Sequence, residues 1–178
     1  TFGNDFYYNT FGNYCRNNTF GDECTANTFG DYCSNNTFDS ECRNNKFGNN
    51  YYNNTLGSEC FSNTFGNDCN DNKFGNSCGS NTFGNDCWNN TFNNYFNSIT
   101  FGSNCSYNNF YHGSGSGTTP KNYIRYIVLE DGCSRNNFYS NVTTSYNNYL
   151  QRIRIKGLEH TTPTSTIITL PTKTKYEW

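Results

Sequence analysis

A nine-residue repeat runs through most of this chain. Residues 63–89 read NTFGNDCND, NKFGNSCGS and NTFGNDCWN, and Phe recurs every nine residues from Phe2 to Phe110 with a single Leu among them. A short period of this kind indicates a solenoid, in which each unit packs against its neighbours along one axis. We number each unit from its Thr, so that Thr64 occupies a first position and Asn72 a ninth.

The composition agrees with a fold held together by repetition. Of the 178 residues, 33% are hydrophobic and 19% are aromatic, so aliphatic side chains are too few for an ordinary core, while the aromatic content argues against disorder. Only 15% are charged, the net charge is −2, and no basic stripe is present. We therefore expect no nucleic-acid partner and, since no apolar run could cross a bilayer, no membrane insertion.

Substitutions within the repeat predict which way each position faces. Leu56 replaces Phe at the second position, and three aromatic residues replace Cys at the sixth: Phe6, Tyr51 and Phe96. Lys46 and Lys73 replace Thr at the first position, whereas Ile99 replaces Asn at the ninth. We therefore expect positions nine, one and two to point in, out and in, as side chains do along a strand.

The third and fourth positions have the composition of a corner. Gly at the third position gives way only to Asp39 and Asn93, the residue types that best tolerate a positive φ, and the fourth position is Asn, Asp or Ser. We therefore expect the left-handed residue of the turn to be the third-position Gly.

Two units are expected to form one coil of an all-β solenoid. Nine residues are too few to close around a Phe, and the fifth position separates into an acidic series and a Tyr-led series in alternate units, although this separation fades after Glu59. We expect roughly six coils rising by about 4.8 Å each. Like residues would then stack into Phe, Cys and Asn ladders, and the buried Asn amides would satisfy one another.

The pattern divides the chain into four segments. We assign 1–112 to the nonapeptide solenoid, 113–126 to a Gly/Ser-rich loop excursion, 127–149 to degenerate repeats, and 150–178 to a C-terminal β cap or the start of a following β-domain. A cap is expected because the end of a solenoid leaves unpaired backbone and exposed rings. The chain begins inside a repeat, so we expect it to be a segment of a longer protein.

The chemistry-bearing residues give little indication of an enzyme or a cofactor. We expect the ten cysteines to be reduced and buried, with disulfides between adjacent coils as the alternative. No zinc or calcium spacing is present, so no metal site is predicted. Neither His112 nor His160 belongs to a recognisable arrangement of nucleophile, base and acid in the sequence, and we predict no catalytic residue.

The seventh position, directly after Cys, is the variable one and is expected to face solvent. It holds several of the residue types that dominate recognition surfaces, and these are our candidate binding residues: Tyr7, Arg16, Arg43, Tyr52, Phe61 and Trp88. Neutral drift at an unconstrained position is the alternative explanation.

The units also resemble a known group of proteins. Tandem Asn-Thr-Phe-Gly-Asn-Asp-Cys units, followed by the stretch Asn-Tyr-Leu-Gln-Arg-Ile-Arg-Ile-Lys-Gly and a Thr-rich strand ending near Trp178, are similar to repeat proteins of phages and prophages of gut Bacteroidales. The resemblance implies a tail-fibre or tail-tip component located in the virion tail or at a cell surface. It implies self-association, as a homotrimer or fibre, and a host-surface glycan or protein as receptor.

Two other functions remain open at this point. An outward Thr rank at Thr10, Thr28, Thr64 and Thr82 would suit an ice-binding solenoid, although Lys46 and Lys73 interrupt the Thr column and a second parallel rank is not evident. A solenoid face could also assemble the paired acids of a polysaccharide depolymerase.

Overall fold

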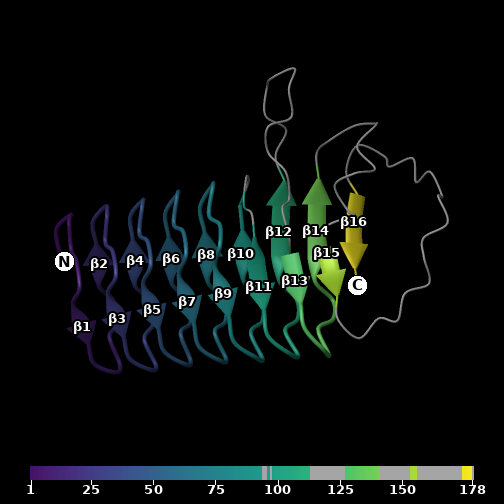
Figure 1. Ribbon diagram of the computed structural model, residues 1–178, viewed down its shortest axis with the longest axis horizontal. Helices are drawn as coiled ribbons and strands as arrows, with labels where there is room; N and C mark the ends of the chain where they lie inside the picture. The colour runs from purple at the N-terminus through teal and green to yellow at the C-terminus, as the bar shows by residue number, and fades with distance from the viewer. Residues whose placement is uncertain (94–95, 97, 113–126, 141–152, 156–173, 178) are drawn as a thin grey trace, which may run out of the picture.

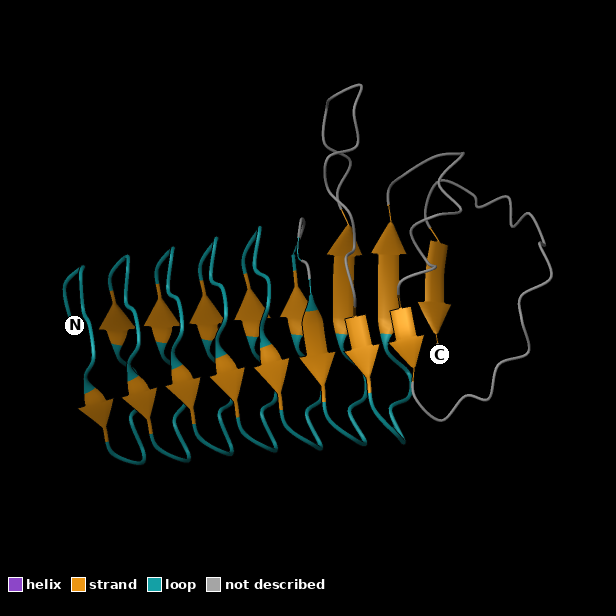
Figure 2. Ribbon diagram, viewed as in Figure 1, coloured by secondary structure: helices purple, strands orange, loops and turns teal. Residues whose placement is uncertain are grey.

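The computed structural model is an all-β solenoid, and it describes residues 1–93, 96, 98–112, 127–140, 153–155 and 174–177. Two eight-stranded sheets run the length of the molecule, one with the odd-numbered strands in order and one with the even-numbered strands (Figure 1). The strands are joined by loops at both edges (Figure 2). We call the loops after the odd strands the lower loops, because they lie at the bottom of Figure 1, and the others the upper loops.

Each strand of the repeat region contains little more than the first two positions of a unit. The odd strands are β1 (Thr10–Phe11), β3 (Thr28–Phe29), β5 (Lys46–Phe47), β7 (Thr64–Phe65), β9 (Thr82–Phe83), β11 (Ile99–Phe101), β13 (Ile127–Leu129) and β15 (Ile153–Ile155). The even strands are β2 (Thr19–Phe20), β4 (Thr37–Phe38), β6 (Thr55–Leu56), β8 (Lys73–Phe74), β10 (Thr91–Phe92), β12 (Asn109–His112), β14 (Asn137–Ser140) and β16 (Thr174–Glu177).

The strand register confirms that two units form one coil. Thr10 pairs with Thr28 and Thr19 with Thr37, and the same parallel register, with partners eighteen residues apart, continues through the repeat region. Alternate units therefore belong to different sheets, as the fifth-position pattern predicted.

The core is built from stacked Phe rings, as the sequence predicted. Rings one coil apart lie nearly parallel, for example Phe65 and Phe83 with centroids 4.5 Å apart and an interplanar angle of 7°. Rings from opposite sheets meet edge to face, as Phe65 and Phe74 do at 5.4 Å and 89°. Both arrangements are favourable for aromatic quadrupoles, and the second-position rings from Phe20 to Phe110 are buried.

Asn ladders at the ninth position supply the hydrogen bonds of the interior. Asn45 is completely buried, and its amide oxygen accepts from the backbone N–H of Asn27 at 2.9 Å and from the Asn27 amide at 3.2 Å. Its own amide donates to the carbonyl oxygen of Cys24 at 2.8 Å. Such ladders explain how so polar a chain buries its Asn residues without leaving their hydrogen bonds unmade.

The prediction of a left-handed Gly at the third position is wrong. Among the described residues only Gly132 is a glycine with a positive φ, and it occupies a fifth position. The left-handed residues are those at the fifth and eighth positions, such as Asp68 with φ of 56° and Asp71 with φ of 58°. Each unit therefore turns twice, and the short segment between the two turns forms a further side of the coil.

Close approach between coils explains the third-position Gly instead. A Cβ atom built on Gly66 would lie 2.5 Å from the side-chain oxygen of Asn49 and 2.8 Å from its backbone nitrogen. That oxygen accepts the backbone N–H of Asn67 at 2.8 Å, so the fourth position forms a second polar ladder along the corner. A side chain at the third position would collide with the fourth-position residue of the neighbouring coil and with its hydrogen bond. The third position is therefore Gly.

Strands from the C-terminal segment continue both sheets. β15 pairs in parallel with β13, and β16 pairs antiparallel with β14, so both add to the final coil that the structure describes. These strands lie in the segment 150–178, for which a β cap or the start of a following β-domain was predicted. The remainder of that segment, including His160, and the excursion predicted at 113–126 lie outside the described residues. The described part of the chain contains no helix that could span a membrane.

Candidate binding surface

The seventh-position residues form two ladders at opposite edges of the sheets. The Tyr52 ladder lies in the lower loops and consists of Arg16, Ser34, Tyr52, Asn70, Trp88, Ser106 and Ser134. The Phe61 ladder lies in the upper loops and consists of Tyr7, Thr25, Arg43, Phe61 and Gly79. The structure therefore separates the six predicted binding residues into two groups of three.

Neighbouring side chains contact the charged and hydroxyl groups of the Phe61 ladder, although the Nε atom of Arg43 is buried without a hydrogen-bond partner. The Arg43 guanidinium lies 5.8 Å from the centre of the Phe61 ring, 3.0 Å from Glu41 and 3.9 Å from Glu59. The Tyr7 hydroxyl donates to Asp5 at 2.9 Å, and this hydrogen bond raises the pKa of Tyr7 to about 12. Arg43 and Phe61 are only partly exposed. This edge therefore offers a partner fewer unused groups.

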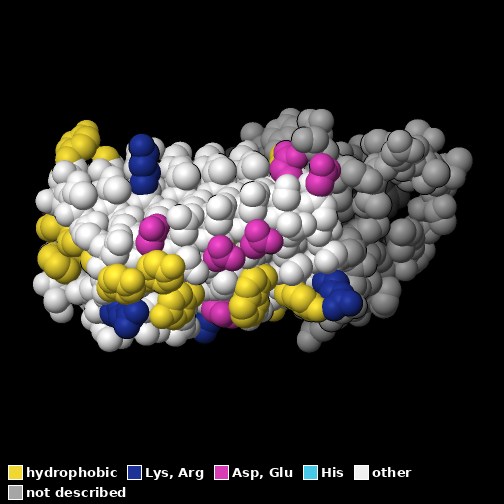
Figure 3. Space-filling view, turned by 90° about the horizontal axis from the view of Figure 1, so that it is seen from below, with side chains coloured by type: hydrophobic (Ala, Val, Ile, Leu, Met, Phe, Trp, Pro, Cys, Tyr) yellow, Lys and Arg dark blue, Asp and Glu magenta, His cyan; other side chains and the backbone are white. Residues whose placement is uncertain are grey.

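The lower loops carry most of the exposed aromatic side chains. Tyr52 is 38% exposed and Trp88 44% exposed, and three tyrosines at other positions of the same loops accompany them: Tyr14, Tyr32 and Tyr107. Seen from below, hydrophobic side chains follow one another along the axis with basic groups beside them (Figure 3). Sequence analysis singled out the seventh position but missed these tyrosines, because it treated the fifth and eighth positions only as corners.

The stacking of exposed aromatic side chains in the lower loops follows the spacing of the coils. The Tyr14 and Tyr32 rings, one coil apart, stack with centroids 5.3 Å apart and an interplanar angle of 13°. The Arg16 guanidinium lies over the Tyr14 ring at 5.5 Å, and Arg135 lies over Tyr107 at the same distance. Where aromatic side chains lie on adjacent coils of this edge, as Tyr14 and Tyr32 do, they stack.

Large and small side chains alternate along the Tyr52 ladder. Ser34 lies between Arg16 and Tyr52 and is only 1% exposed, because longer side chains on both sides cover it. Asn70 lies between Tyr52 and Trp88, and its amide oxygen accepts the backbone N–H of Trp88 at 2.9 Å. In the described part of the chain, neither the Tyr52 ring nor the Trp88 ring has an aromatic neighbour.

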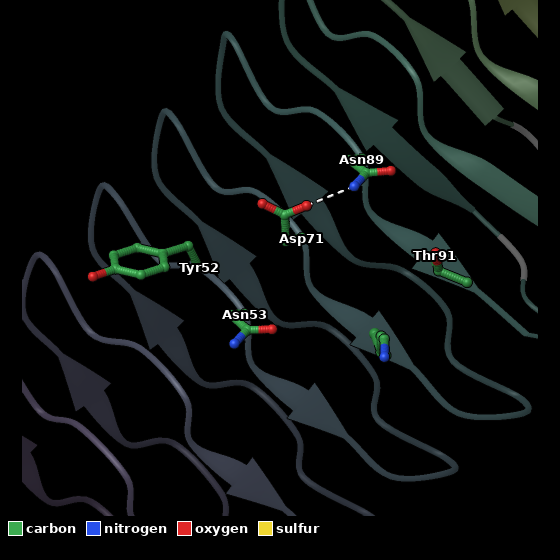
Figure 4. Close-up of a pocket in the computed structure, with 6 residues that line it drawn as sticks. Tyr52, Asn53, Asp71, Asn89 and Thr91 are labelled. Atoms are coloured by element: carbon green, nitrogen blue, oxygen red, sulfur yellow. Dashed lines mark hydrogen bonds between the residues drawn. The ribbon is translucent and has the colours of Figure 1, made fainter.

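A shallow pocket lies beside Tyr52, where the lower loops meet the even sheet. Tyr52, Asn53, Asp71, Lys73, Asn89 and Thr91 line it, and they come from successive coils (Figure 4). One carboxylate oxygen of Asp71 accepts a hydrogen bond from the Asn89 amide at 2.6 Å. The pocket thus combines an aromatic ring, a carboxylate, an ammonium group and a hydroxyl. This set of groups suits a ligand rich in hydroxyls.

The first-position residues form one outward rank on each sheet. Thr10, Thr28, Thr64 and Thr82 are exposed on the odd sheet, where Lys46 interrupts them, and Lys73 interrupts the rank of the even sheet. Since the next residue of each two-residue strand points into the core, neither sheet has a second Thr rank beside the first. The paired ranks expected of an ice-binding face are therefore not formed by these strands.

The described residues form no cluster of three or more His, Cys, Asp or Glu side chains that could hold a metal ion. All ten cysteines are free thiols, most of them buried in two columns. Burial raises the pKa of Cys33 from 9.0 to about 11.

Comparison with known proteins finds no matching family model, no matching curated protein and no matching solved structure. The class that the fold itself defines is a β-solenoid of nonapeptide units with internal Asn and Phe ladders.

Proposed function

We propose that this chain is a non-enzymatic structural segment of a virion or cell-surface fibre that contacts a host-cell surface through its lower loops. The observation that carries the proposal is the concentration of exposed Tyr and Trp side chains at one edge of the solenoid. Aromatic residues that remain exposed on a rigid scaffold are the type that supplies binding energy in recognition surfaces.

The architecture supports a shaft that displays such a surface. Every coil is tied to the next by backbone hydrogen bonds, Phe stacks and Asn ladders, so side chains on successive coils keep a fixed spacing. The resemblance of the repeat units to tail-fibre proteins of gut Bacteroidales phages also supports this role.

Attachment to bacterial cells tests the proposal. Fluorescently labelled chain would be incubated with a panel of gut Bacteroidales strains and measured by flow cytometry. A triple variant of the Tyr52 ladder, with Arg16, Tyr52 and Trp88 replaced by Ser, should lose attachment to any strain that binds the natural chain. The matched variant of the Phe61 ladder, with Tyr7, Arg43 and Phe61 replaced by Ser, should retain it. Equal attachment by both variants, or no attachment of the natural chain to any strain, would contradict the proposal.

A further inference from the structure

We propose that sulfur atoms on adjacent coils of one thiol column bind a soft monovalent metal ion such as Cu(I), held by two sulfurs in a line. We call this column the lower thiol column, and it consists of the sixth-position residues of four successive coils: Cys69, Cys87, Cys105 and Cys133. The inference is independent of the proposed function, because it concerns the interior of the solenoid and not its exposed side chains.

The sulfurs of the lower thiol column share one orientation. The Cys69 Sγ atom lies 3.6 Å from the Gly48 carbonyl oxygen on the preceding coil. The Cys87 Sγ atom makes the equivalent contact with Gly66 at 3.6 Å, and Cys105 repeats it at 3.3 Å with the next third-position residue. The Gly66 oxygen also lies 3.3 Å from the Cys69 Sγ atom, so two neighbouring sulfurs contact one oxygen. Sulfurs with the same contacts are therefore related by the repeat of the coils.

This repeat brings neighbouring sulfurs to the span of a linear ion. Other equivalent side chains of the same coils show its size, since the ring centroids are 4.5 Å apart from Phe65 to Phe83 and 4.6 Å apart from Phe83 to Phe101. Two metal–sulfur bonds of about 2.3 Å, the length found with zinc, span roughly 4.6 Å in a line. A two-coordinate ion would therefore fit between adjacent sulfurs without a change in the coils.

Backbone N–H groups support negative charge on three of these sulfurs. The Cys69 N–H donates to the Cys87 Sγ atom at 3.4 Å, and the Cys87 N–H donates to the Cys105 Sγ atom at 3.3 Å. The Cys105 N–H donates to the Cys133 Sγ atom, also at 3.3 Å. A hydrogen bond to the charged form of a group favours that form, so these contacts stabilise the thiolates that a metal ion needs.

A second thiol column, in the upper loops, provides the comparison. We call it the upper thiol column, and it consists of Cys24, Cys42, Cys60 and Cys78. Its sulfurs contact carbonyl oxygens, but among the described residues they receive no hydrogen bond from a backbone N–H. We therefore assign the ion to the lower thiol column.

The row of sulfurs favours a two-coordinate ion over zinc. Zinc takes four ligands in a tetrahedron, whereas the described residues form no cluster of three or more metal-ligating side chains. Thiolates are the soft ligands that select Cu(I). Sequence analysis found no chelating spacing because ligands eighteen residues apart come together only when the chain coils.

Binding would exchange protons for the metal without a change of oxidation state. Each ion forms two metal–sulfur bonds and displaces two thiol protons to solvent. A buried thiolate is disfavoured on its own, but the cation leaves a net charge of only −1 on a pair of thiolates, and the N–H groups stabilise this charge. Cys133 is partly exposed, which gives an ion access to one end of the column.

Competition for Cu(I) tests the inference. The reduced full chain would be titrated without oxygen into the coloured Cu(I) complex of bicinchoninate, while circular dichroism checks that the chain stays folded. We expect the folded chain to withdraw copper from the complex, and X-ray absorption of the loaded chain to show two sulfur neighbours for each copper. No withdrawal of copper, or a copper site with three or more ligands, would overturn the inference.

Two double variants establish where the copper binds. Cys87→Val with Cys105→Val removes every adjacent pair of sulfurs from the lower thiol column and should lower the affinity for the first Cu(I) by roughly tenfold or more. Cys42→Val with Cys60→Val removes the same number of thiols from the upper thiol column and should bind as the natural chain does. Equal affinities in the two double variants would show that the lower thiol column is not the site.

A single variant keeps the test decisive if the lower double variant does not fold. Cys105→Val leaves one adjacent pair in the lower thiol column, that of Cys69 and Cys87. Native mass spectrometry should then find at least one copper ion fewer than in the natural chain. An unchanged number of copper ions in the folded variant would contradict the assignment.

Discussion

Asn72 and Asn90, one coil apart, are joined by two hydrogen bonds to a single oxygen. The Asn90 amide oxygen accepts from the Asn72 backbone N–H and from the Asn72 amide, both at 3.1 Å. Asn72 in turn accepts the same pair from Asn54 and donates to the Tyr51 carbonyl at 2.8 Å. Each ladder Asn therefore links three coils.

Replacing Asn72 with Leu should be among the most destabilising single changes in the chain. The substitution removes one acceptor and one amide donor from a site with no solvent exposure, and leaves the amide of Asn54 without this partner. We expect a loss on the order of 3 kcal/mol in the free energy of unfolding, since each unsatisfied buried polar group costs about 1–3 kcal/mol. Urea unfolding measures this value. Asn93→Ala, at an exposed site, should change it by less than about 0.5 kcal/mol, and a similar loss in both variants would contradict the ladder's role.

The third-position Gly allows a test with an internal control. Gly66→Ala should destabilise the chain by about 1–3 kcal/mol, because its Cβ would lie 2.8 Å from the carbonyl carbon of Gly48 as well as close to Asn49. Gly12→Ala occupies the same place in the repeat but has nothing within 4 Å, so it should be nearly neutral. Comparable unfolding midpoints for the two variants would show that the Gly is retained for another reason.

This Gly also shows what the sequence could and could not predict. The period of this Gly and its replacement by Asp39 and Asn93 correctly predicted that it lies at a corner. They did not predict which residue of the corner has a positive φ. A positive φ and a close approach both select Gly, and only the stacking of coils distinguishes them. The inward and outward columns were predictable because substitutions such as Leu56 and Lys46 preserve the character of each face.

The candidate binding surface was predictable only in part. Variability at the seventh position identified Tyr52 and Trp88, but their separation from Phe61 depends on which units share an edge. The order of side chains along the Tyr52 ladder requires residues eighteen and thirty-six apart to be compared in three dimensions. A linear scan of the repeat gives no reason to relate them.

Tyr51 replaces Cys in a coil where Leu56 replaces Phe, and the two changes are expected to be coupled. The centre of the Tyr51 ring lies 4.4 Å from that of Phe47 and 5.7 Å from that of Phe65. Its hydroxyl is buried and has no hydrogen-bond partner. Tyr51→Phe should therefore keep the packing and raise the free energy of unfolding by about 1 kcal/mol, because an unsatisfied buried polar group is removed. A loss of stability in urea unfolding would indicate that the hydroxyl has a partner.

The free thiols predict that reductant has little effect on stability. Cys69 is fully buried and its Sγ donates to the Gly66 carbonyl at 3.3 Å, so it acts as a small core residue rather than as half of a crosslink. Cys69→Val should fold, and the melting temperature of the natural chain should be the same with and without a phosphine reductant. A drop of tens of degrees on reduction would show that disulfides join the coils.

Alkaline pH should destabilise the solenoid through the same thiols. Burial raises the pKa of Cys33 from 9.0 to about 11, so between these values the unfolded chain loses the proton while the folded chain keeps it. The contribution of the Cys33 thiol to the free energy of unfolding is therefore complete below pH 9 and declines as the pH rises toward 11. Urea unfolding in reductant across this range should show a falling free energy of unfolding, and Cys33→Val should reduce the slope because it removes one of the titrating groups. Val is chosen because its volume is close to that of Cys and it has no proton to lose. An unchanged slope in Cys33→Val would show that other groups, such as the buried Tyr51, dominate the alkaline transition.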